Sequence, residues 1–198
     1  MKILYTLDDQ YLREIRNRSL DLSDFRERTR ILAHNILENI LEKIPLERHK
    51  DIVPVIILRA GVVFLEPLLN LLPRNPIGFL GMKRDETTAR AEIYHKTLPK
   101  LTADSIILIL DPMLATAGTL QLAIDECNRA LLADADKIDT SRQTYYFAGF
   151  IASARGLRIA SLELPPQNIF ILAVDPELDA RQFIVPGLGD FGDRFLGC

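Results

Sequence analysis

Hydrophobic residues recur along this 198-residue chain with two different spacings. Between Asp21 and Ile44 they follow helical spacing, which predicts a long helix that Asp21 or Ser23 caps and that Pro45 ends. A shorter helix around residues 8–18 is expected before it. Later hydrophobic runs are too short for helices: VPVIIL (53–58), IGFLGM (77–82), SIILIL (105–110), YYFAGFI (145–151) and IFILAV (169–174). These runs predict about five strands buried on both faces, as in a mostly parallel sheet.

Helical patterns separate most of these strands, at residues 62–72, 119–132 and roughly 154–163. Such alternation predicts the α/β class, with a mostly parallel central sheet, flanking helices and right-handed crossovers. The length favours one domain over 1–198, and its parts are the N-terminal helices (1–50), the α/β core (51–174) and a tail (175–198).

Residues 83–99, KRDETTARAEIYHKTLP, do not fit the alternation. They form a charged connection where a compact domain normally uses a few residues, and long connections of this kind are usually functional or mobile. We therefore expect this segment to be functional or mobile.

Composition excludes several classes of protein. A net charge of −3 and a pI near 5.7 give no general basic field for nucleic acid, so any anion site is local. Cys127 and Cys198 have neither disulfide-scaffold nor zinc-site spacing, and the expected compartment is the cytoplasm. The first apolar run is too short for a signal peptide, and Arg59, Glu66 and two prolines interrupt the apolar stretch 53–73, which is read as a strand and a helix rather than a membrane span.

The segment DPMLATAGT (111–119) follows the strand SIILIL. In open α/β sheets ligands bind outside the carboxyl ends of the strands, so Asp111 is the first side chain in the expected crevice. The turn from Ala115 to Thr119 can direct backbone N–H groups, two hydroxyls and a helix N-terminus at one phosphate. The alternative is an ordinary strand-to-helix turn, in which a threonine caps the helix and the glycine relieves strain.

The tail contains GLGDFG (187–192), which formally matches a dinucleotide-binding fingerprint. Only six residues follow it, so no βαβ unit can form there and a dinucleotide site is not expected. Its glycines suit tight turns or close approach to a ligand, with Asp190 and Asp193 adding carboxylates. A glycine-rich C-terminal coil is the alternative.

Three motifs in order, ILRAG (57–61), DPMLATAGT (111–119) and IVPGLGDFGDRFLG (184–197), resemble those of uracil phosphoribosyltransferase. The similarity extends from about residue 53 to the end. The resemblance implies a phosphoribosyltransferase-like fold, phosphoribosyl pyrophosphate and uracil as substrates, UMP and pyrophosphate as products, Mg²⁺ held mainly through the substrate, and a homodimer or higher homo-oligomer. With these substrates, the charged segment 83–99 is expected to close over the site as a lid.

The same resemblance implies roles for individual residues. Arg59 and Arg84 would bind pyrophosphate, and Asp111 would hold the ribose hydroxyls. The implied substrate-binding set is Asp111, Pro112, Met113, Leu114, Ala115, Thr116, Ala117, Gly118 and Thr119 for the phosphoribosyl group, and Val185, Asp190, Phe191 and Gly192 for the base, largely through backbone groups. Taken alone, Arg59 or Arg84 would more readily be interpreted as a solvated surface charge.

The chain departs from the family pattern in three regions. The phosphate loop has Ala117 and Thr119 where the family usually has Gly and Ser, and an alanine there is costly only if the position needs a positive φ. The segment 43–51 is shorter than the family's hairpin-like one, and Arg155 replaces an acidic residue. These departures leave two alternatives open: a relative that binds a uridine nucleotide or phosphoribosyl pyrophosphate as a regulator, and a phosphoribosyltransferase for another base.

Overall fold

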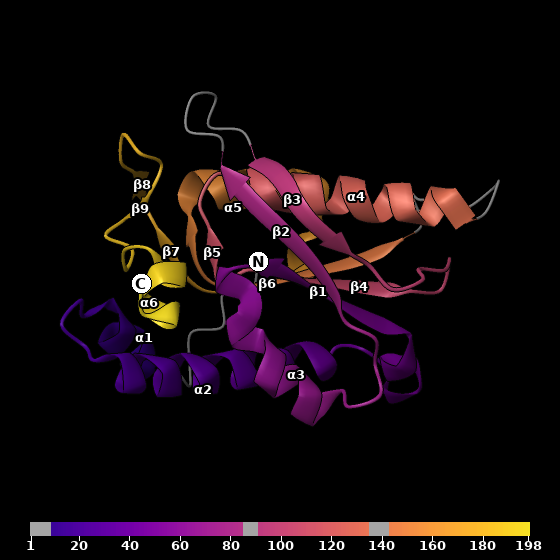
Figure 1. Ribbon diagram of the computed structural model, residues 1–198, viewed down its shortest axis with the longest axis horizontal. Helices are drawn as coiled ribbons and strands as arrows, with labels where there is room; N and C mark the ends of the chain where they lie inside the picture. Colours follow the sequence, from indigo (N-terminus) through magenta and orange to yellow (C-terminus); the bar gives the residue numbers. More distant parts are fainter. Residues whose placement is uncertain (1–8, 85–90, 135–142) are drawn as a thin grey trace.

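The computed structural model describes residues 9–84, 91–134 and 143–198 (Figure 1). The elements in chain order are α1 (Asp9–Arg16), α2 (Leu22–Leu41), η1 (Leu46–Asp51), β1 (Ile52–Leu58), η2 (Ala60–Phe64), α3 (Leu65–Leu71), β2 (Gly78–Arg84), β3 (Ala91–Thr97), β4 (Ile106–Leu110), β5 (Met113–Leu114), α4 (Gly118–Asp134), β6 (Thr144–Ser153), α5 (Ala154–Glu163), η4 (Pro166–Asn168), β7 (Ile169–Asp175), β8 (Glu177–Leu178), β9 (Ile184–Val185) and α6 (Phe191–Leu196).

A seven-stranded sheet forms the centre, in the order β3-β2-β1-β4-β6-β7. The short strand β5 pairs with the end of β6, on the same side as β4. All pairs are parallel except β2 with β3. The expectation of a mostly parallel α/β sheet is therefore confirmed, and each of the five predicted strands is present.

The segment 83–99 differs from its prediction. It is not one long connection, because Lys83 and Arg84 extend β2 and residues 91–97 form β3. Charged and polar residues occupy much of β3, which lies at the edge of the sheet, and this composition concealed the strand. Residues 85–90, the centre of the expected lid, lie outside the described residues.

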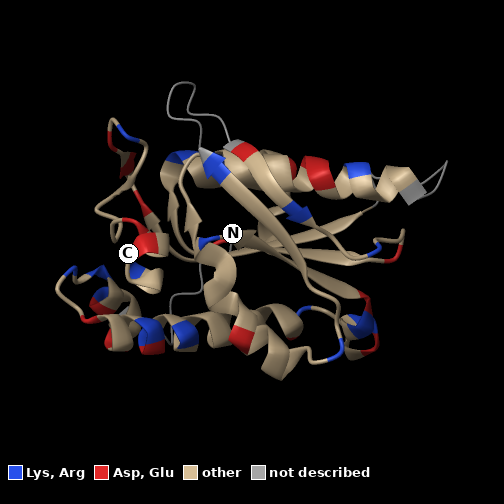
Figure 2. Ribbon diagram, in the orientation of Figure 1, with Lys and Arg blue, Asp and Glu red and all other residues tan. Residues whose placement is uncertain are grey.

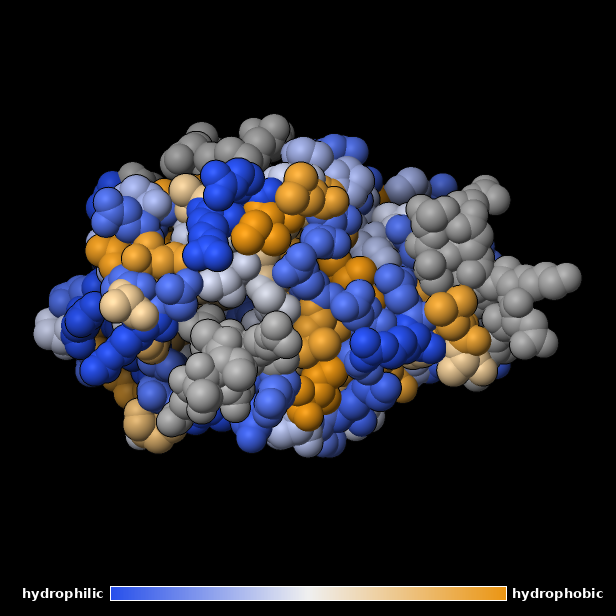
Figure 3. Space-filling model, turned by 90° about the horizontal axis from the view of Figure 1, so that it is seen from above, coloured by the Kyte–Doolittle hydropathy of each residue, from blue (hydrophilic) through white to orange (hydrophobic). Residues whose placement is uncertain are grey.

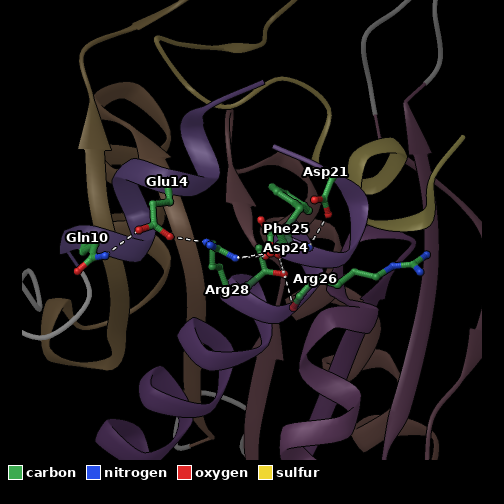
Figure 4. Close-up of polar contacts among 8 residues, drawn as sticks. Gln10, Glu14, Asp21, Asp24, Phe25, Arg26 and Arg28 are labelled. Carbon is green, nitrogen blue, oxygen red and sulfur yellow. Dashed lines mark hydrogen bonds and ion pairs between the residues drawn. The ribbon is translucent and has the colours of Figure 1, made fainter. Parts of the chain in front are cut away.

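The predicted helices are present with shifted ends. Asp21, rather than Ser23, caps α2, because its side chain accepts a hydrogen bond of 2.9 Å from the backbone N–H of Asp24 (Figure 4). The helix ends at Leu41 and not at Pro45, which instead precedes η1. The shortened segment 43–51 thus contains a 3₁₀ helix.

Helices cover the two faces of the sheet, as Figure 1 shows. One hydrophobic cluster joins the sheet to α2, η2, α3 and α6, and a second joins it to α4 and α5. Ile56 belongs to the first cluster and its neighbour Ile57 to the second, so the same strand is buried on both sides. Cys127 is buried in the second cluster, on α4.

The tail is not a coil. Strands β8 and β9 form an antiparallel pair, and α6 packs against η2 and α2. The ring of Phe191 is fully buried, with its centroid 5.4 Å from that of Phe25 and 5.6 Å from that of Phe150. These contacts fix α6 beside the carboxyl ends of the strands.

The surface is mixed. In the view of Figure 3 hydrophobic residues form separate groups among hydrophilic ones. Within 9–84, 91–134 and 143–198, no helix is long and apolar enough to cross a membrane. The apolar stretch 53–73 is the strand β1 followed by η2 and α3, as predicted.

Candidate functional site at the carboxyl edge of the sheet

The candidate site lies where the chain leaves β1 and β4, two neighbouring parallel strands. From β1 the chain crosses to β2 through α3, on one face of the sheet, whereas from β4 it crosses to β6 through α4, on the other. The strands therefore diverge at a topological switch point, where open α/β sheets bind ligands. Arg59 follows β1 and Asp111 follows β4, and the tail lies at the same edge (Figure 1).

The two strand exits are tightly packed together. A Cβ atom on Gly61 would lie 2.6 Å from the carbonyl oxygen of Leu110, the last residue of β4. No side chain fits at that distance, so glycine at residue 61 allows η2 to contact the end of β4 directly. The glycine of the ILRAG motif thus brings the Arg59 and Asp111 segments together.

The loop after Asp111 is held by the backbone of β6. The carbonyl oxygen of Pro112 accepts hydrogen bonds of 2.8 Å and 3.1 Å from the N–H groups of Phe150 and Ile151. Residues 113–114 then pair with β6 as the short strand β5. The first half of the predicted phosphate loop is therefore an extension of the sheet.

Two residues that the sequence analysis did not single out hold the second half of this loop. Ser153 Oγ donates a 2.5 Å hydrogen bond to the carbonyl oxygen of Ala115 and accepts one of 2.8 Å from the N–H of Gly156. A Cβ atom on Gly156 would lie 2.4 Å from the same carbonyl oxygen. Both residues belong to the segment ASARGL (152–157), in which Arg155 is exposed.

Ala117 has φ of 62°, in the left-handed region. This is the condition under which an alanine at residue 117 costs stability, about 1–2 kcal/mol. Its side chain is buried in the second hydrophobic cluster, which includes Leu120. Burial of the methyl group there means that it does not fill the space in front of the loop.

The 17-residue helix α4 begins at Gly118, directly after this left-handed residue. Thr116 Oγ1 accepts a long hydrogen bond, 3.5 Å, from the N–H of Gly118, and Thr119 is half-buried in the first turn of α4. The arrangement places two hydroxyls and the N-terminus of a full helix at one loop, which is the geometry that binds phosphate groups.

Asp111 is half-buried, and its Oδ1 is 3.4 Å from the N–H of Met113. Burial raises the pKa of its carboxyl group to about 7, although the hydrogen bond from Met113 acts in the opposite direction. Among the described residues, no charged side chain pairs with this carboxylate, so ligand hydroxyls that donate to it would favour its ionised form.

Arg59 is exposed, and the peptide bond before it is cis. Its guanidinium donates a 2.8 Å hydrogen bond to Asp193 Oδ1 and lies 3.6 Å from Cys198 Sγ. These hydrogen bonds, chiefly the one to Asp193, raise the pKa of Arg59. The arginine of the first motif therefore contacts the tail directly.

Arg84 is the last residue of β2 and pairs through its backbone with Ala91 of β3. Its side chain lies outside the described part of the chain. Because β2 is parallel to β1, its end lies at the same edge of the sheet as Arg59. The structure thus brings the segment of Arg84 to the site without testing its predicted contact.

The four predicted base-binding residues differ in exposure. Val185 and Asp190 are exposed, whereas Phe191 and Gly192 are buried. Asp190 caps α6 by accepting a 2.9 Å hydrogen bond from the N–H of Asp193. The ring of Phe191 belongs to the core, so this residue can offer a ligand only backbone groups.

Gly192 joins the tail to the ILRAG segment, since a Cβ atom on it would lie 3.9 Å from the backbone nitrogen of Ala60. Figure 2 shows acidic and basic residues close together around the C-terminus. Within the described ranges, no group of three or more His, Cys, Asp or Glu residues could hold a metal ion.

Together these features define the fold that solved phosphoribosyltransferases have. A purine phosphoribosyltransferase from Pyrococcus horikoshii has a TM-score of 0.52 over 73% of this chain and 83% of its own, at 14% sequence identity. A hypoxanthine-guanine phosphoribosyltransferase from Bacillus anthracis gives 0.51 over 78% and 80%, at 12% identity. At these identities the likeness concerns the fold alone.

Sequence comparison identifies the family. The model of the uracil phosphoribosyltransferase family matches residues 46–198, and the chain belongs to that family. It is similar to the uracil phosphoribosyltransferases of Aquifex aeolicus, with 40% identity over 73% of this chain and 64% of the relative, and of Malacoplasma penetrans, with 33% identity over 94% and 91%. The solved structure of the AQ2163 protein from Aquifex aeolicus has a TM-score of 0.84, 32% identity, and coverage of 98% of this chain and 96% of its own.

Proposed function

We propose that the protein transfers the 5-phosphoribosyl group from phosphoribosyl pyrophosphate to uracil, with UMP and pyrophosphate as products. The observation that carries this proposal is the convergence of three motifs at one edge of the sheet. Gly61 packs against the end of β4, Arg59 contacts Asp193, and Gly192 lies beside Ala60. Family membership supports the same reaction.

In this proposal the loop 112–119 binds the 5′-phosphate of the sugar and Asp111 accepts hydrogen bonds from the ribose hydroxyls. Support comes from the left-handed turn at Ala117, the N-terminus of α4 and the hydroxyls of Thr116 and Thr119. Phosphate oxygens in this position would accept hydrogen bonds from the free N–H groups of the first turn.

Arg59, together with Arg84, would bind the pyrophosphate group. The exposed guanidinium of Arg59 is bound to a single carboxylate, that of Asp193, and a diphosphate offers it more negative charge than one carboxylate does. Binding of the substrate would thus exchange one partner of Arg59 for another. The charge on the leaving group would then be stabilised where it develops.

The tail would bind uracil through backbone groups around Val185, Asp190 and Gly192. Uracil presents two carbonyl acceptors and ring N–H donors, which a fixed backbone can match. Cytosine carries an amino donor in place of one acceptor, so it would leave buried polar groups unpaired.

The reaction requires positioning more than a strong nucleophile. The bond between C1′ and the pyrophosphate oxygen breaks, the bond between C1′ and N1 of uracil forms, and N1 loses its proton. The transition state resembles a ribosyl cation, so holding both substrates in line and stabilising the departing pyrophosphate account for most of the catalysis.

Mg²⁺ would bind mainly to the diphosphate and ribose oxygens of the substrate. This fits the donor set at the site, because Mg²⁺ keeps several waters and commonly uses substrate phosphates rather than an all-protein cage. When bound, the ion would supply charge neutralisation of the pyrophosphate.

Several further features stay predictions that accompany the proposal: one domain over 1–198, a homodimer or higher homo-oligomer, a cytoplasmic location, and no nucleic-acid or membrane partner. Closure of residues 83–99 as a lid is another. The C-terminal end of that segment is anchored in the edge strand β3, where Lys96 forms a 3.0 Å ion pair with Glu126 of α4.

The direct test is the formation of UMP and pyrophosphate from uracil, phosphoribosyl pyrophosphate and Mg²⁺. We expect turnover by the parent protein and a loss of about a hundredfold or more in kcat/KM after Asp111→Ala. Asp125→Ala is the matched control, because Asp125 is an exposed carboxylate on α4. It should retain parental activity.

Two outcomes would contradict the proposal. Product formation with another base but not with uracil would make the protein a phosphoribosyltransferase of different specificity. Binding of UMP or phosphoribosyl pyrophosphate without any product would favour a regulator, an alternative that no observation on the described residues supports.

A further inference from the structure

We propose that Arg16 of α1, acting through Asp175, is a positioning residue that sets the geometry of the base-binding tail. The base-binding tail is residues 184–192, a part of the longer tail 175–198. The inference rests on the proposed function, because it assigns the tail to uracil. Arg16 lies outside the family-model match, which begins at Leu46.

Arg16 and Asp175 form a two-pronged ion pair. Arg16 Nη1 donates to Asp175 Oδ2 at 2.7 Å, and Arg16 Nη2 donates to Asp175 Oδ1 at 2.8 Å. The side chain of Asp175 is only 6% exposed, and that of Arg16 is 23% exposed. The two residues are 159 positions apart in sequence, so the pair joins α1 to the end of β7.

Both members of this pair also bind the backbone of Gly187. Arg16 Nη1 donates to the carbonyl oxygen of Gly187 at 3.0 Å, and the N–H of Gly187 donates to Asp175 Oδ2 at 2.8 Å. The two peptide planes on either side of Gly187 are therefore fixed by one charged pair. Hydrogen bonds to charged groups are shorter and stronger than neutral ones, which makes this a specific constraint.

The Arg16–Asp175 pair acts at the turn that sets the direction of the tail. Gly187 has φ of 54° and follows the cis bond between Val185 and Pro186. A Cβ atom on Gly187 would lie 2.1 Å from the carbonyl oxygen of Ile184, so the turn is as tight as glycine allows. A small rotation at Gly187 would move the backbone groups of Val185 and Asp190, on which recognition of the base depends.

A second arginine, on the C-terminal helix α6, connects the tail back to the end of α1. Arg194 of α6 donates to the carbonyl oxygens of Ile15 at 2.6 Å, Asn17 at 2.8 Å and Leu188 at 2.8 Å. Its guanidinium lies 4.1 Å from the centre of the Phe25 ring. The tail is thus bound to the end of α1 from both sides.

Helix α1 is itself fastened to α2, as Figure 4 shows. Glu14 forms an ion pair with Arg28, and Gln10 donates a 2.8 Å hydrogen bond to Glu14. Arg28 also forms a 3.0 Å ion pair with Asp24. A fixed α1 can position the tail, whereas a loose helix could not.

The test compares Arg16→Met and Arg16→Lys with the parent in steady-state kinetics. Lysine keeps the charge but cannot form the two-pronged pair and the Gly187 contact together. We expect the KM for uracil to rise about tenfold or more in Arg16→Met and by an intermediate factor in Arg16→Lys. The KM for phosphoribosyl pyrophosphate should stay within about twofold of the parent in both.

Arg48→Met is the matched control. Arg48 also joins a carboxylate, Asp51 at 2.6 Å, to a backbone carbonyl, that of Asp104 at 2.8 Å. It does so before the start of β4, at the opposite edge of the sheet from the tail. Both KM values should remain close to the parental ones.

A second readout does not depend on activity. Amide hydrogen exchange in a peptide covering residues 184–192 should speed up about tenfold or more in Arg16→Lys and remain parental in Arg48→Met. A parent without UMP formation would overturn the proposed function, and exchange would still decide whether Arg16 holds the tail. Parental exchange in the tail of Arg16→Lys would overturn the positioning role, and so would equal increases in both KM values.

Discussion

The phosphate loop, residues 111–119, and the base-binding tail, residues 184–192, lie at the same edge of the sheet but are held in different ways. The loop is held by its immediate neighbours in the fold: β6 binds the carbonyl oxygen of Pro112, and Ser153 and Gly156 contact Ala115. The tail is held by charged side chains: Arg16, from the opposite end of the sequence, and Asp175 bind Gly187, and Arg194 binds Leu188.

This difference separates the two substrates. The loop is largely an extension of the parallel sheet, so its geometry follows once the strands pair. The tail lies outside the main sheet: its strand β9 pairs with β8, Phe191 packs in the core, and the ion pair between Arg16 and Asp175 fixes its turn at Gly187. Changes at the β6–α5 junction should therefore affect phosphoribosyl pyrophosphate first, and changes in α1 should affect uracil first.

The largest effect is expected from Gly156→Ala, which disrupts the packing that holds the phosphate loop. The added Cβ atom would lie 2.4 Å from the carbonyl oxygen of Ala115 and 2.6 Å from that of Leu114. Helix propensity favours alanine in α5 by only about 1 kcal/mol, so the clash dominates. We expect a net loss of about 2 kcal/mol in the free energy of unfolding and a raised KM for phosphoribosyl pyrophosphate, measured by urea denaturation and kinetics.

Gly118→Ala is the stability control for this prediction. The nearest atom to a Cβ atom on Gly118 is Thr116 Oγ1, at an ordinary 3.6 Å. Its free energy of unfolding should stay within about 1 kcal/mol of the parent. Equal losses in the two variants would mean that close packing on Ala115 does not hold the loop.

The pH dependence should give a smaller effect, again confined to the sugar substrate. Because burial raises the pKa of Asp111 to about 7, a carboxylate that accepts hydroxyl hydrogen bonds becomes available as pH rises through 7. We expect the affinity for phosphoribosyl pyrophosphate to increase about tenfold between about pH 6 and pH 8. In Asp111→Asn this dependence should be absent, and an unchanged profile in that variant would assign the titration to another group.

Stability should respond to the same group in the opposite direction. The folded state holds the Asp111 proton more tightly than the unfolded state, in which the carboxyl group has its ordinary pKa of 3.8. The contribution is therefore fully present below about pH 4 and is lost as pH rises towards 7. Asp111→Asn should remove this loss between these pH values in urea denaturation.

The smallest effect is expected from Ala117→Gly. Glycine relieves a left-handed φ that costs alanine about 1–2 kcal/mol. Glycine also increases the conformational entropy of the unfolded chain, which lowers stability by about 0.4–1 kcal/mol. It removes a buried methyl group that contributes about 0.8 kcal/mol. These terms nearly cancel, so thermal unfolding should reveal a net change below about 1 kcal/mol. A gain in the free energy of unfolding above about 1 kcal/mol would show that the methyl group contributes little to packing.

Much of the fold could be predicted from local patterns. The five main strands are runs buried on both faces, and a run such as SIILIL at 105–110 carries that information in its own composition. The polar edge strand β3 was missed, because a strand with charged residues such as Glu92 and Lys96 has no hydrophobic run. The two-residue strands β5, β8 and β9 are likewise too short to leave a periodic signal.

The site was predictable where it rests on motifs and not where it rests on contacts between distant residues. Arg59, Asp111 and Asp190 stand in recognisable motifs, and the structure brings their segments to one edge. Arg16 and Asp175 carry no local signal, since a single arginine at a helix end is ordinary. Gly156 had one available signal, a glycine in the first turn of a predicted helix, which usually has a packing reason.

The measurement that tests this account most directly is the pair of KM values, for phosphoribosyl pyrophosphate and for uracil, in Ser153→Ala and Arg16→Lys. Ser153→Ala removes the hydroxyl that binds Ala115 and Gly156, whereas Arg16→Lys weakens the hold on Gly187. We expect opposite patterns: the KM for phosphoribosyl pyrophosphate should rise in Ser153→Ala, and the KM for uracil should rise in Arg16→Lys. Parallel increases of both KM values in both variants would contradict this account.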